Sequence, residues 1–338
     1  MKILITGNHG YIGRVLTANL ISKHDIIGVD CDYFPPNKVF GRFDAYEASN
    51  KVKTYKIDIR STDKLAHLLK DIDAVVHLAA LPNDFAANLA PEMTNKINFL
   101  ATKELAVIAK SAGVKKLIFA SSCSVYGAKG DELINEEDEP NPLTPYAWSK
   151  YRSEQALMAL ADKDFTVTCM RNATCFGVSP RMRFDMVVHN ITGYGYLEKE
   201  IRLRGDGSAW RALVHIEDLS QAYSLALRDG ITGIYSIVGE NYRIIDLGKE
   251  IAEMLGMKMS IMLPDKDARS YKVDGSKAEQ ELGYKPRITV KDGIKEVYDL
   301  YVSKPLTSEE FNQPYYWAEK QFKYLMENNL VDIDLYKR

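Results

Sequence analysis

Tyr146 and Lys150 have the residue types and the spacing of a proton-transfer pair. Residues 145–160 are predicted to form a helix, so positions i and i+4 share one face. A free tyrosine has a pKa of about 10, which is too high for a base at neutral pH. A lysine ammonium ~5 Å from the phenolate, at an effective dielectric constant of ~20, contributes roughly 3 kcal/mol and brings the tyrosine pKa to roughly 8. We therefore expect Tyr146, with Lys150 beside it, to act as a general base toward an alcohol.

A cluster of serines precedes this pair in the segment Ser-Ser-Cys-Ser-Val-Tyr-Gly, residues 121–127. Ser122 comes just after a predicted strand, and its hydroxyl can hydrogen-bond the same substrate oxygen that Tyr146 deprotonates. Ser121 and Ser124 are competing choices, because serines at a strand end are common turn residues. Cys123 is expected to be a small buried thiol rather than a reactive one. We take Ser122, Tyr146 and Lys150 as the catalytic residues.

The chain opens with a glycine-rich turn, Gly7-x-x-Gly10-x-x-Gly13, between a predicted strand at 2–6 and a predicted helix at 11–23. Gly7 allows a tight turn, Gly10 lets backbone N–H groups approach a pyrophosphate, and Gly13 lets the helix pack closely on the sheet. The phosphates would lie at the positive end of the helix. This arrangement predicts a bound dinucleotide.

Three further strand ends are expected to complete the dinucleotide site. Asp30 ends the second predicted strand, where a carboxylate accepts hydrogen bonds from ribose hydroxyls and repels a 2′-phosphate. No basic residue follows it closely, since the next three are Cys31, Asp32 and Tyr33. This favours NAD over NADP, and the positive charge of an oxidised nicotinamide would lower the pKa of Tyr146 further. The other two strand ends are expected to touch the adenine and to leave room for the dinucleotide: Asp58, Ile59, Leu78, Ala79 and Ala80.

The elements that must position these residues alternate between short β-branched-rich runs and helical stretches. Strands are predicted near 2–6, 25–30, 53–57, 74–78, 116–120 and 166–170, with helices at 11–23, 62–69, 91–112 and 145–160. This alternation predicts an α/β fold with a Rossmann-type doubly wound parallel sheet, and ligands beyond the carboxyl ends of the strands.

After about residue 175 the pattern becomes irregular. We expect an NAD-binding domain at 1–173 plus about 212–240, a smaller C-terminal substrate-binding lobe at about 174–211 plus 241–303, and a C-terminal extension at 304–338 that packs on the body through its aromatic residues.

Composition excludes several other classes of protein. The 338 residues carry a formal net charge of -2, with 46% apolar and 27% charged residues, which is the balance of an ordinary globular chain and favours neither a nucleic-acid nor a membrane partner. The apolar run at residues 3–5 is too short for a signal peptide or a membrane span. Four cysteines show neither metal spacing nor a disulfide framework. We expect a cytoplasmic protein without a metal site.

The combination of these motifs resembles the extended short-chain dehydrogenase/reductases of the nucleotide-sugar epimerase/dehydratase family. The resemblance covers roughly residues 1–300. It rests on the glycine loop, Asp30, Asp58-Ile59, His-Leu-Ala-Ala at 77–80, the serine segment, Tyr146 to Lys150, Arg171 to Gly177, Trp-Arg-Ala-Leu-Val-His-Ile-Glu-Asp at 210–218, and the run from Ser276 to Tyr284. It implies a homodimer, NAD as cofactor and a nucleotide-diphosphate sugar as substrate.

The resemblance also assigns individual residues. Toward the cofactor it adds Tyr11 and Ile12 at the pyrophosphate, Asn98, Ser121, and Ala173 beside the nicotinamide. Independently of the resemblance, Arg211 and Arg269 in the smaller lobe are suited to bind phosphate oxygens in a bidentate manner. His189 and His215 are expected to be structural. The residues expected to contact substrate are Ser122, Cys123, Ser124, Tyr146, Thr174, Asn190, Arg211 and Arg269.

The shared first step of this family is oxidation of a sugar hydroxyl, and the fate of the resulting keto sugar distinguishes the enzymes. A 4,6-dehydratase of the family carries Asp-Glu directly after the hydroxyl residue, where this chain has Cys123 and Ser124. We therefore expect an epimerase acting at C4 through a transient 4-keto sugar. An NAD-dependent hexose or heptose dehydrogenase or a 4-keto reductase keeps the same triad and stays open. Less favoured are a dehydratase, an epimerase that uses Cys123 with His189 next to a ketone, and a non-catalytic NAD-binding sensor.

Overall fold

The computed structural model describes residues 1–34, 52–262 and 268–332, and it places a seven-stranded parallel sheet at the centre of the N-terminal part. The strand order is β11-β7-β5-β4-β1-β2-β3, and every neighbouring pair is parallel. The predicted α/β fold class with a doubly wound sheet is therefore confirmed. The strands are β1 Lys2–Thr6, β2 Asp25–Asp30, β3 Val52–Lys56, β4 Ala74–His77, β5 Lys116–Ser122, β7 Thr166–Asn172 and β11 Gly233–Ile237.

Helices cover both faces of this sheet because its buried strands are apolar on both sides. Alternate residues of one strand point to opposite faces, so Ile3 and Ile5 belong to one core and Leu4 to the other. Helices α1 (Tyr11–Leu20) and α8 (Ile216–Ala226) pack together over the first face. Helices α2 (Thr62–Leu68), α5 (Ala101–Ser111) and α6 (Pro145–Leu160) cover the second. The short α3 (Asp84–Leu89), α4 (Pro91–Thr94) and a π-helical turn (Asn95–Leu100) fill the connection from β4 to α5.

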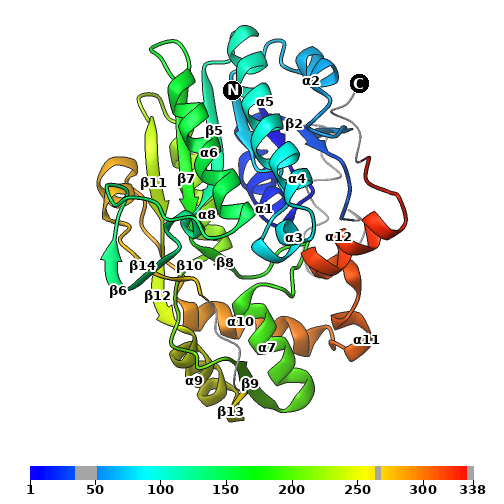
Figure 1. The fold of residues 1–338 in the computed structure, drawn as a ribbon, viewed down its shortest axis with the longest axis vertical. Coiled ribbons are helices and arrows are strands. Elements are labelled where there is room, and N and C mark those ends of the chain that lie inside the picture. The colour runs from blue at the N-terminus through cyan, green and yellow to red at the C-terminus, as the bar shows by residue number, and fades with distance from the viewer. Residues whose placement is uncertain (35–51, 263–267, 333–338) are drawn as a thin grey trace.

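The smaller C-terminal part carries three small sheets and its own apolar core. A three-stranded sheet joins β12 (Glu240–Arg243), β10 (Trp210–His215) and β8 (Thr174–Phe176). Two pairs are added, β13 (Lys258–Met262) with β9 (Glu200–Arg204) and β14 (Ser270–Val273) with β6 (Ala128–Ile134). Helices α7 (Val187–Glu198), α9 (Ile244–Leu255) and α10 (Val290–Ser303) lie among them (Figure 1). The segment near 212–240 was expected to return to the large sheet. Its strand β11 joins that sheet and its helix α8 packs on the first face, whereas β10 pairs with β8 and β12 instead.

The described part of the C-terminal extension folds back onto the body, as its aromatic content suggested. It holds α11 (Ser308–Phe311), a 3-10 turn (Pro314–Tyr316) and α12 (Ala318–Glu327), and Figure 1 shows α12 beside α3. Phe322 and Leu325 of α12 are buried in the core on the second face of the sheet. Of the helices in the described ranges, none has the length and apolar character needed to cross a membrane.

Candidate active site

A cofactor cavity lies at the carboxyl ends of β1, β2, β3 and β4. It brings together eleven residues that the sequence predicted for the dinucleotide: Gly7, Gly10, Tyr11, Ile12, Gly13, Asp30, Asp58, Ile59, Leu78, Ala79 and Ala80. Other residues in its wall were not foreseen, among them Tyr33, Phe34, Arg181 and Arg183. These four come from loops with no motif of their own, and only tertiary packing places them here.

The glycine loop is held tightly against the neighbouring strand ends. Gly7 has φ +76°, and a Cβ on it would lie 2.8 Å from the backbone nitrogen of Ala79. A Cβ on Gly13 would lie 2.1 Å from the carbonyl oxygen of Gly7, so only glycine lets α1 approach the loop. The N-cap of α1 is Gly10, which provides no side-chain cap for the first N–H groups of the helix. The start of α1 therefore fits a pyrophosphate, as the sequence indicated.

Asp30 and Asp58, the carboxylates predicted to lie near the ribose and the adenine, both line the cofactor cavity. The Asp30 carboxylate accepts hydrogen bonds from the backbone nitrogens of His9 (3.1 Å) and Asp32 (2.9 Å), and burial raises the pKa of this carboxyl above its usual value. Burial opposes ionisation of Asp58 too, but hydrogen bonds and charge from Arg60 outweigh it and keep the pKa of Asp58 low. A partly buried carboxylate at the end of β2 fits the ribose hydroxyls of NAD.

A second cavity adjoins the cofactor cavity, and residues such as Ile12, Ala120 and Arg183 line both. We call it the sugar cavity, because most residues predicted to contact the sugar line it. Of the predicted residues, the sugar cavity brings together Ser121, Ser122, Ser124, Tyr146, Lys150, Ala173, Thr174, Asn190, Arg211 and Arg269. Two predicted residues, Cys123 and Asn98, line neither cavity.

Asn98 and Cys123 face the protein interior instead. The Asn98 side chain accepts a hydrogen bond from the Leu81 nitrogen (2.8 Å) and donates to the Leu81 carbonyl (3.1 Å), so it shapes the loop after β4. Cys123 is fully buried, and its thiol donates to the carbonyl oxygen of Arg171 (3.2 Å). The prediction of substrate contact through Cys123 finds no support in this geometry, because Cys123 begins the 3-10 turn Cys123–Tyr126 after β5 and its thiol faces the core.

The Ser122–Tyr146–Lys150 triad is assembled where β5 ends against α6. Thr144 caps the helix by accepting from the nitrogen of Ala147 (3.1 Å), which sets the start of α6 one residue before Tyr146. Ser122 and Tyr146 line the same cavity, and the Ser122 hydroxyl acts to lower the pKa of Tyr146 by favouring its phenolate. The Lys150 Nζ donates to the carbonyl oxygen of Ala120 (2.7 Å) and lies 5.7 Å from the centroid of the Tyr146 ring.

The competing serines have different surroundings. The Ser121 hydroxyl donates to Oε1 of Glu154 at 2.5 Å, and Glu154 is also bound by Arg171 at 2.8 Å. The Ser121 hydroxyl is thus part of a buried hydrogen-bond network with Glu154 and Arg171. The buried Ser124 Oγ lines the sugar cavity and has no hydrogen-bond partner in the described structure. Ser122 is therefore the serine whose hydroxyl acts on the pKa of Tyr146, whereas Ser124 presents its hydroxyl at the wall of the sugar cavity.

The electrostatics of the triad differ from the expectation drawn from sequence. Burial raises the pKa of Tyr146, the carboxylate of Asp84 raises it further, and Ser122 and Arg183 act in the opposite direction. Burial also lowers the pKa of Lys150 to about 7, although Glu154 partly opposes this. The expectation that Lys150 brings the pKa of Tyr146 to roughly 8 is therefore wrong for the protein alone. It treated both groups as if they stayed in contact with solvent, and packing removes them from it.

Arg211 and Arg269, the two arginines predicted to bind the diphosphate, both line the sugar cavity and contact each other. The Arg211 guanidinium donates to the carbonyl oxygen of Arg269 (2.6 Å) and lies 5.5 Å from the Tyr271 ring. Arg269 forms an ion pair with Asp84, which also accepts from the hydroxyl of Thr144. Sequence reasoning missed Asp84, because no motif marks the start of α3. The Asn190 amide lines the cavity while donating to the Phe184 carbonyl (3.1 Å).

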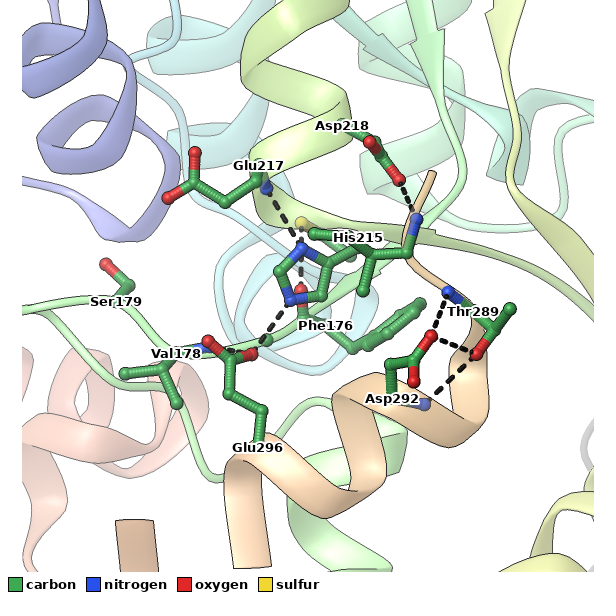
Figure 2. Close-up of polar contacts among 12 residues, drawn as sticks. Phe176, Val178, Ser179, His215, Glu217, Asp218, Thr289, Asp292 and Glu296 are labelled. Atoms are coloured by element: carbon green, nitrogen blue, oxygen red, sulfur yellow. Dashed lines mark hydrogen bonds and ion pairs between the residues drawn. The ribbon is translucent and has the colours of Figure 1, made fainter. Parts of the chain in front are cut away.

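The two histidines hold the backbone around the site rather than face it. His189 is fully buried between the nitrogen of Gly177 (3.0 Å) and the carbonyl of Arg183 (2.7 Å), and burial lowers its pKa to about 4. Figure 2 shows His215 between Glu296 of α10 (2.8 Å) and the backbone nitrogen of Glu217 (3.3 Å). Both serve structural roles, as predicted. An epimerase reaction that uses Cys123 with His189 is therefore not favoured, because both side chains are fully buried and neither lines the sugar cavity. Within the described ranges, no three His, Cys, Asp or Glu side chains gather in a way that could hold a metal ion.

Comparison with known proteins agrees with this geometry. The model of the NAD dependent epimerase/dehydratase family matches residues 3–238. A UDP-glucuronate 4-epimerase of Thermodesulfobacterium geofontis is 30% identical over 305 residues, which cover 86% of this chain and 93% of that protein. The crystal structure of a UDP-glucuronic acid 4-epimerase from Bacillus cereus, in complex with UDP-glucuronic acid and NAD, matches with a TM-score of 0.78 and 28% identity over 90% of this chain and all of that one. A dTDP-glucose 4,6-dehydratase of Streptomyces venezuelae with NAD bound matches with a TM-score of 0.79 and 25% identity, covering 90% and 97%.

Proposed function

This chain belongs to the NAD-dependent epimerase/dehydratase family, and we propose that within the family it is an epimerase that inverts C4 of a nucleotide sugar. The cofactor is NAD, which supplies a reversible hydride acceptor when bound. Tyr146 accepts the proton of the C4 hydroxyl, Ser122 orients that hydroxyl, and Lys150 supports the phenolate. Arg211 and Arg269 hold the diphosphate, so that the keto sugar can turn over while it stays attached.

The observation that carries this proposal is a complete triad with no carboxylate directly after it. Ser122, Tyr146 and Lys150 line one cavity, while Cys123 is turned into the core and Ser124 offers only a hydroxyl. The nearby carboxylate of Asp84 is bound by Arg269 and Thr144. A dehydratase needs a further acid and base at the sugar, whereas an epimerase needs only the triad and room to turn the sugar.

We propose a UDP-sugar as the substrate, either a neutral hexose or a hexuronate. The support comes from the relatives: one is a UDP-glucuronate 4-epimerase, and one solved structure is a complex with UDP-glucuronic acid. The sugar cavity offers the Ser124 hydroxyl, the Thr174 side chain and the Arg183 guanidinium to the sugar. Both sugar classes have hydrogen-bonding groups that these side chains can meet.

The proposed function is tested by asking whether the protein inverts C4 of a nucleotide sugar without net oxidation of the sugar. Purified protein is incubated with UDP-glucose, UDP-galactose, UDP-glucuronate or UDP-galacturonate, each carrying deuterium at C4, and followed by NMR. We expect C4 to be scrambled, deuterium to stay at C4, and no NADH absorbance to accumulate. Tyr146→Phe should abolish turnover and still bind NAD. Formation of NADH in stoichiometric amounts, or of a stable keto sugar, would instead show that the protein is a dehydrogenase or a 4-keto reductase.

We also propose that the protein is a homodimer in the cytoplasm. The outer faces of α5 and α6 expose the large apolar side chains Val107 (43% exposed) and Trp148 (49% exposed), and the helices are adjacent. Apolar side chains on neighbouring helices are suited to a symmetric helix-to-helix interface. All four cysteines are free, which is typical of a reducing compartment. Light scattering tests the dimer, and cell fractionation tests the location.

A further inference from the structure

Residues 181–185, Arg-Met-Arg-Phe-Asp, alternate between two environments. Arg181 and Arg183 line the cofactor cavity, while Met182 and Phe184 are fully buried among aromatic residues of α10 and the C-terminal extension. The segment belongs to the loop between β8 and α7, and its side chains alternate although it forms no strand. The segment therefore has one side on the ligand sites and the other on the extension.

Arg183 is held at the junction of the two cavities by a single carboxylate. Its Nε and Nη2 atoms donate to Oδ1 and Oδ2 of Asp185 at 3.0 Å and 2.7 Å, and the two side chains are 12% and 9% exposed. This bidentate geometry fixes the plane of the guanidinium. Arg183 lines both cavities, and Tyr146 shares the sugar cavity with it. Its positive charge favours the ionised form of Tyr146.

Asp185 is in turn held by two other parts of the chain. Its Oδ2 accepts a hydrogen bond from the side chain of Asn83 (2.7 Å), which caps α3 at the edge of the sugar cavity. The same oxygen accepts from the backbone nitrogen of Ala318 (3.2 Å), the first residue of α12. One carboxylate thus joins the arginine, the loop before α3 and the C-terminal extension.

The C-terminal extension contacts residues 181–185 at a second point, through Phe184. The nitrogen of Phe184 donates to the carbonyl oxygen of Tyr316 (3.0 Å), and the Phe184 ring lies 4.6 Å from that of Tyr316 and 5.0 Å from that of Phe311. The extension is tied to the cofactor cavity as well, since Gln321 of α12 donates to the carbonyl of Tyr33 (2.8 Å). Figure 1 shows α12 beside α3 and α11 below it, next to α7 and α10.

We propose that Asp185 is a positioning residue that fixes the Arg183 guanidinium between cofactor and sugar, and that the C-terminal extension holds Asp185 in place through Ala318 and the aromatic contacts of Phe184. The extension is then part of the active-site support, although none of its described residues (304–332) lines either cavity. This inference rests on the proposed function for its kinetic test, but its structural test does not.

Replacing Ala318 with proline removes the N–H that donates to Asp185 and changes no charge. Proline is well tolerated at the first position of a helix, and Trp317, with φ -120° and ψ 114°, already has the extended conformation that a residue before proline prefers. Ala318→Ser keeps the N–H and is the matched control. Arg183→Gln removes the cation directly and reports the effect of its loss. Thermal melts of all three variants serve to check that each is folded before the measurements below.

Two measurements distinguish positioning from general stability. The first is hydrogen exchange of peptides covering residues 181–186, which we expect to be at least several-fold faster in Ala318→Pro than in Ala318→Ser. The second is the acid limb of kcat against pH, which reports the general base in the complex. Loss of a nearby cation raises the pKa of Tyr146, so the limb should move to higher pH, by about one unit in Arg183→Gln and by less in Ala318→Pro.

Unchanged exchange at 181–186 together with an unmoved limb in Ala318→Pro would overturn the proposal. An unmoved limb in Arg183→Gln would also overturn it, because the arginine would then have no influence on the base. If no UDP-sugar is turned over by the unaltered protein, the proposed function fails. Faster exchange in Ala318→Pro than in Ala318→Ser would still support the coupling between the extension and Asp185.

Discussion

Replacing Lys150 with methionine should stabilise the protein at neutral pH while abolishing its turnover. Lys150 is 3% exposed, and burial lowers its pKa from 10.5 to about 7. Between these two values the unfolded chain binds a proton that the folded chain does not, so stability rises with pH across this window and the cost is fully present below pH 7. Methionine has a similar length and no charge, and it removes that cost.

The size of the effect follows from the two pKa values. A pKa difference of about 3.5, at 1.36 kcal/mol per unit, corresponds to about 4 kcal/mol at pH 7, where the folded lysine is half protonated. Losing the hydrogen bond to the Ala120 carbonyl takes back about 1–2 kcal/mol. The net gain is about 2–3 kcal/mol. For 338 residues, with an unfolding entropy of about 2.1 cal/mol/K per residue, this raises Tm by about 3–4 °C.

The assay is thermal unfolding from pH 6 to pH 10, after exhaustive removal of nucleotide, since bound NAD would add its own stabilisation. The advantage of Lys150→Met should be largest at pH 7 and below and should disappear toward pH 10. Lys163, an exposed lysine, provides the control, and Lys163→Met should change stability by less than about 0.5 kcal/mol at every pH. A Lys150→Met protein that melts below the unaltered protein by a constant margin across this range would refute the reasoning.

Three further outcomes are expected from the site and the surface. Arg211→Ala and Arg269→Ala should each raise KM for the nucleotide sugar roughly 10–100-fold with a smaller change in kcat, because both are placed to grip the diphosphate, and initial rates measure this. Asp30→Asn should weaken NAD binding about tenfold and reduce discrimination against NADP, measured by fluorescence titration of both cofactors, because the ribose loses a charged acceptor. Trp148→Glu should convert the proposed dimer to a monomer in light scattering without lowering Tm by more than a degree or two, because Trp148 is 49% exposed on the outer face of α6.

Local sequence patterns were sufficient to predict the main sheet and to select Ser122, Tyr146 and Lys150, which the structure brings into one cavity. Alternating apolar runs and helical stretches predicted the order of the elements, because the periods of strands and helices are local properties of the backbone. The spacing of Tyr146 and Lys150 placed them on one face of α6, and the glycine spacing predicted a loop that the structure shows to exclude a Cβ at Gly13. Boundaries shifted by up to three residues, as at the end of α1, and the predicted helix at 91–112 contains a π-helical turn at Asn95–Leu100.

The tertiary structure alone decided which of the chemically possible side chains reach the site. Cys123 and Ser124 are neighbours in sequence, yet the thiol faces the core and the hydroxyl faces the sugar cavity. Asp185 meets Arg183 locally but meets Asn83 and Ala318 only after the chain has folded back on itself. The pKa values of Tyr146 and Lys150 depend on how completely packing removes them from water. Spacing determines which residues share an element, whereas burial and contacts distant in sequence depend on the packing of all elements together.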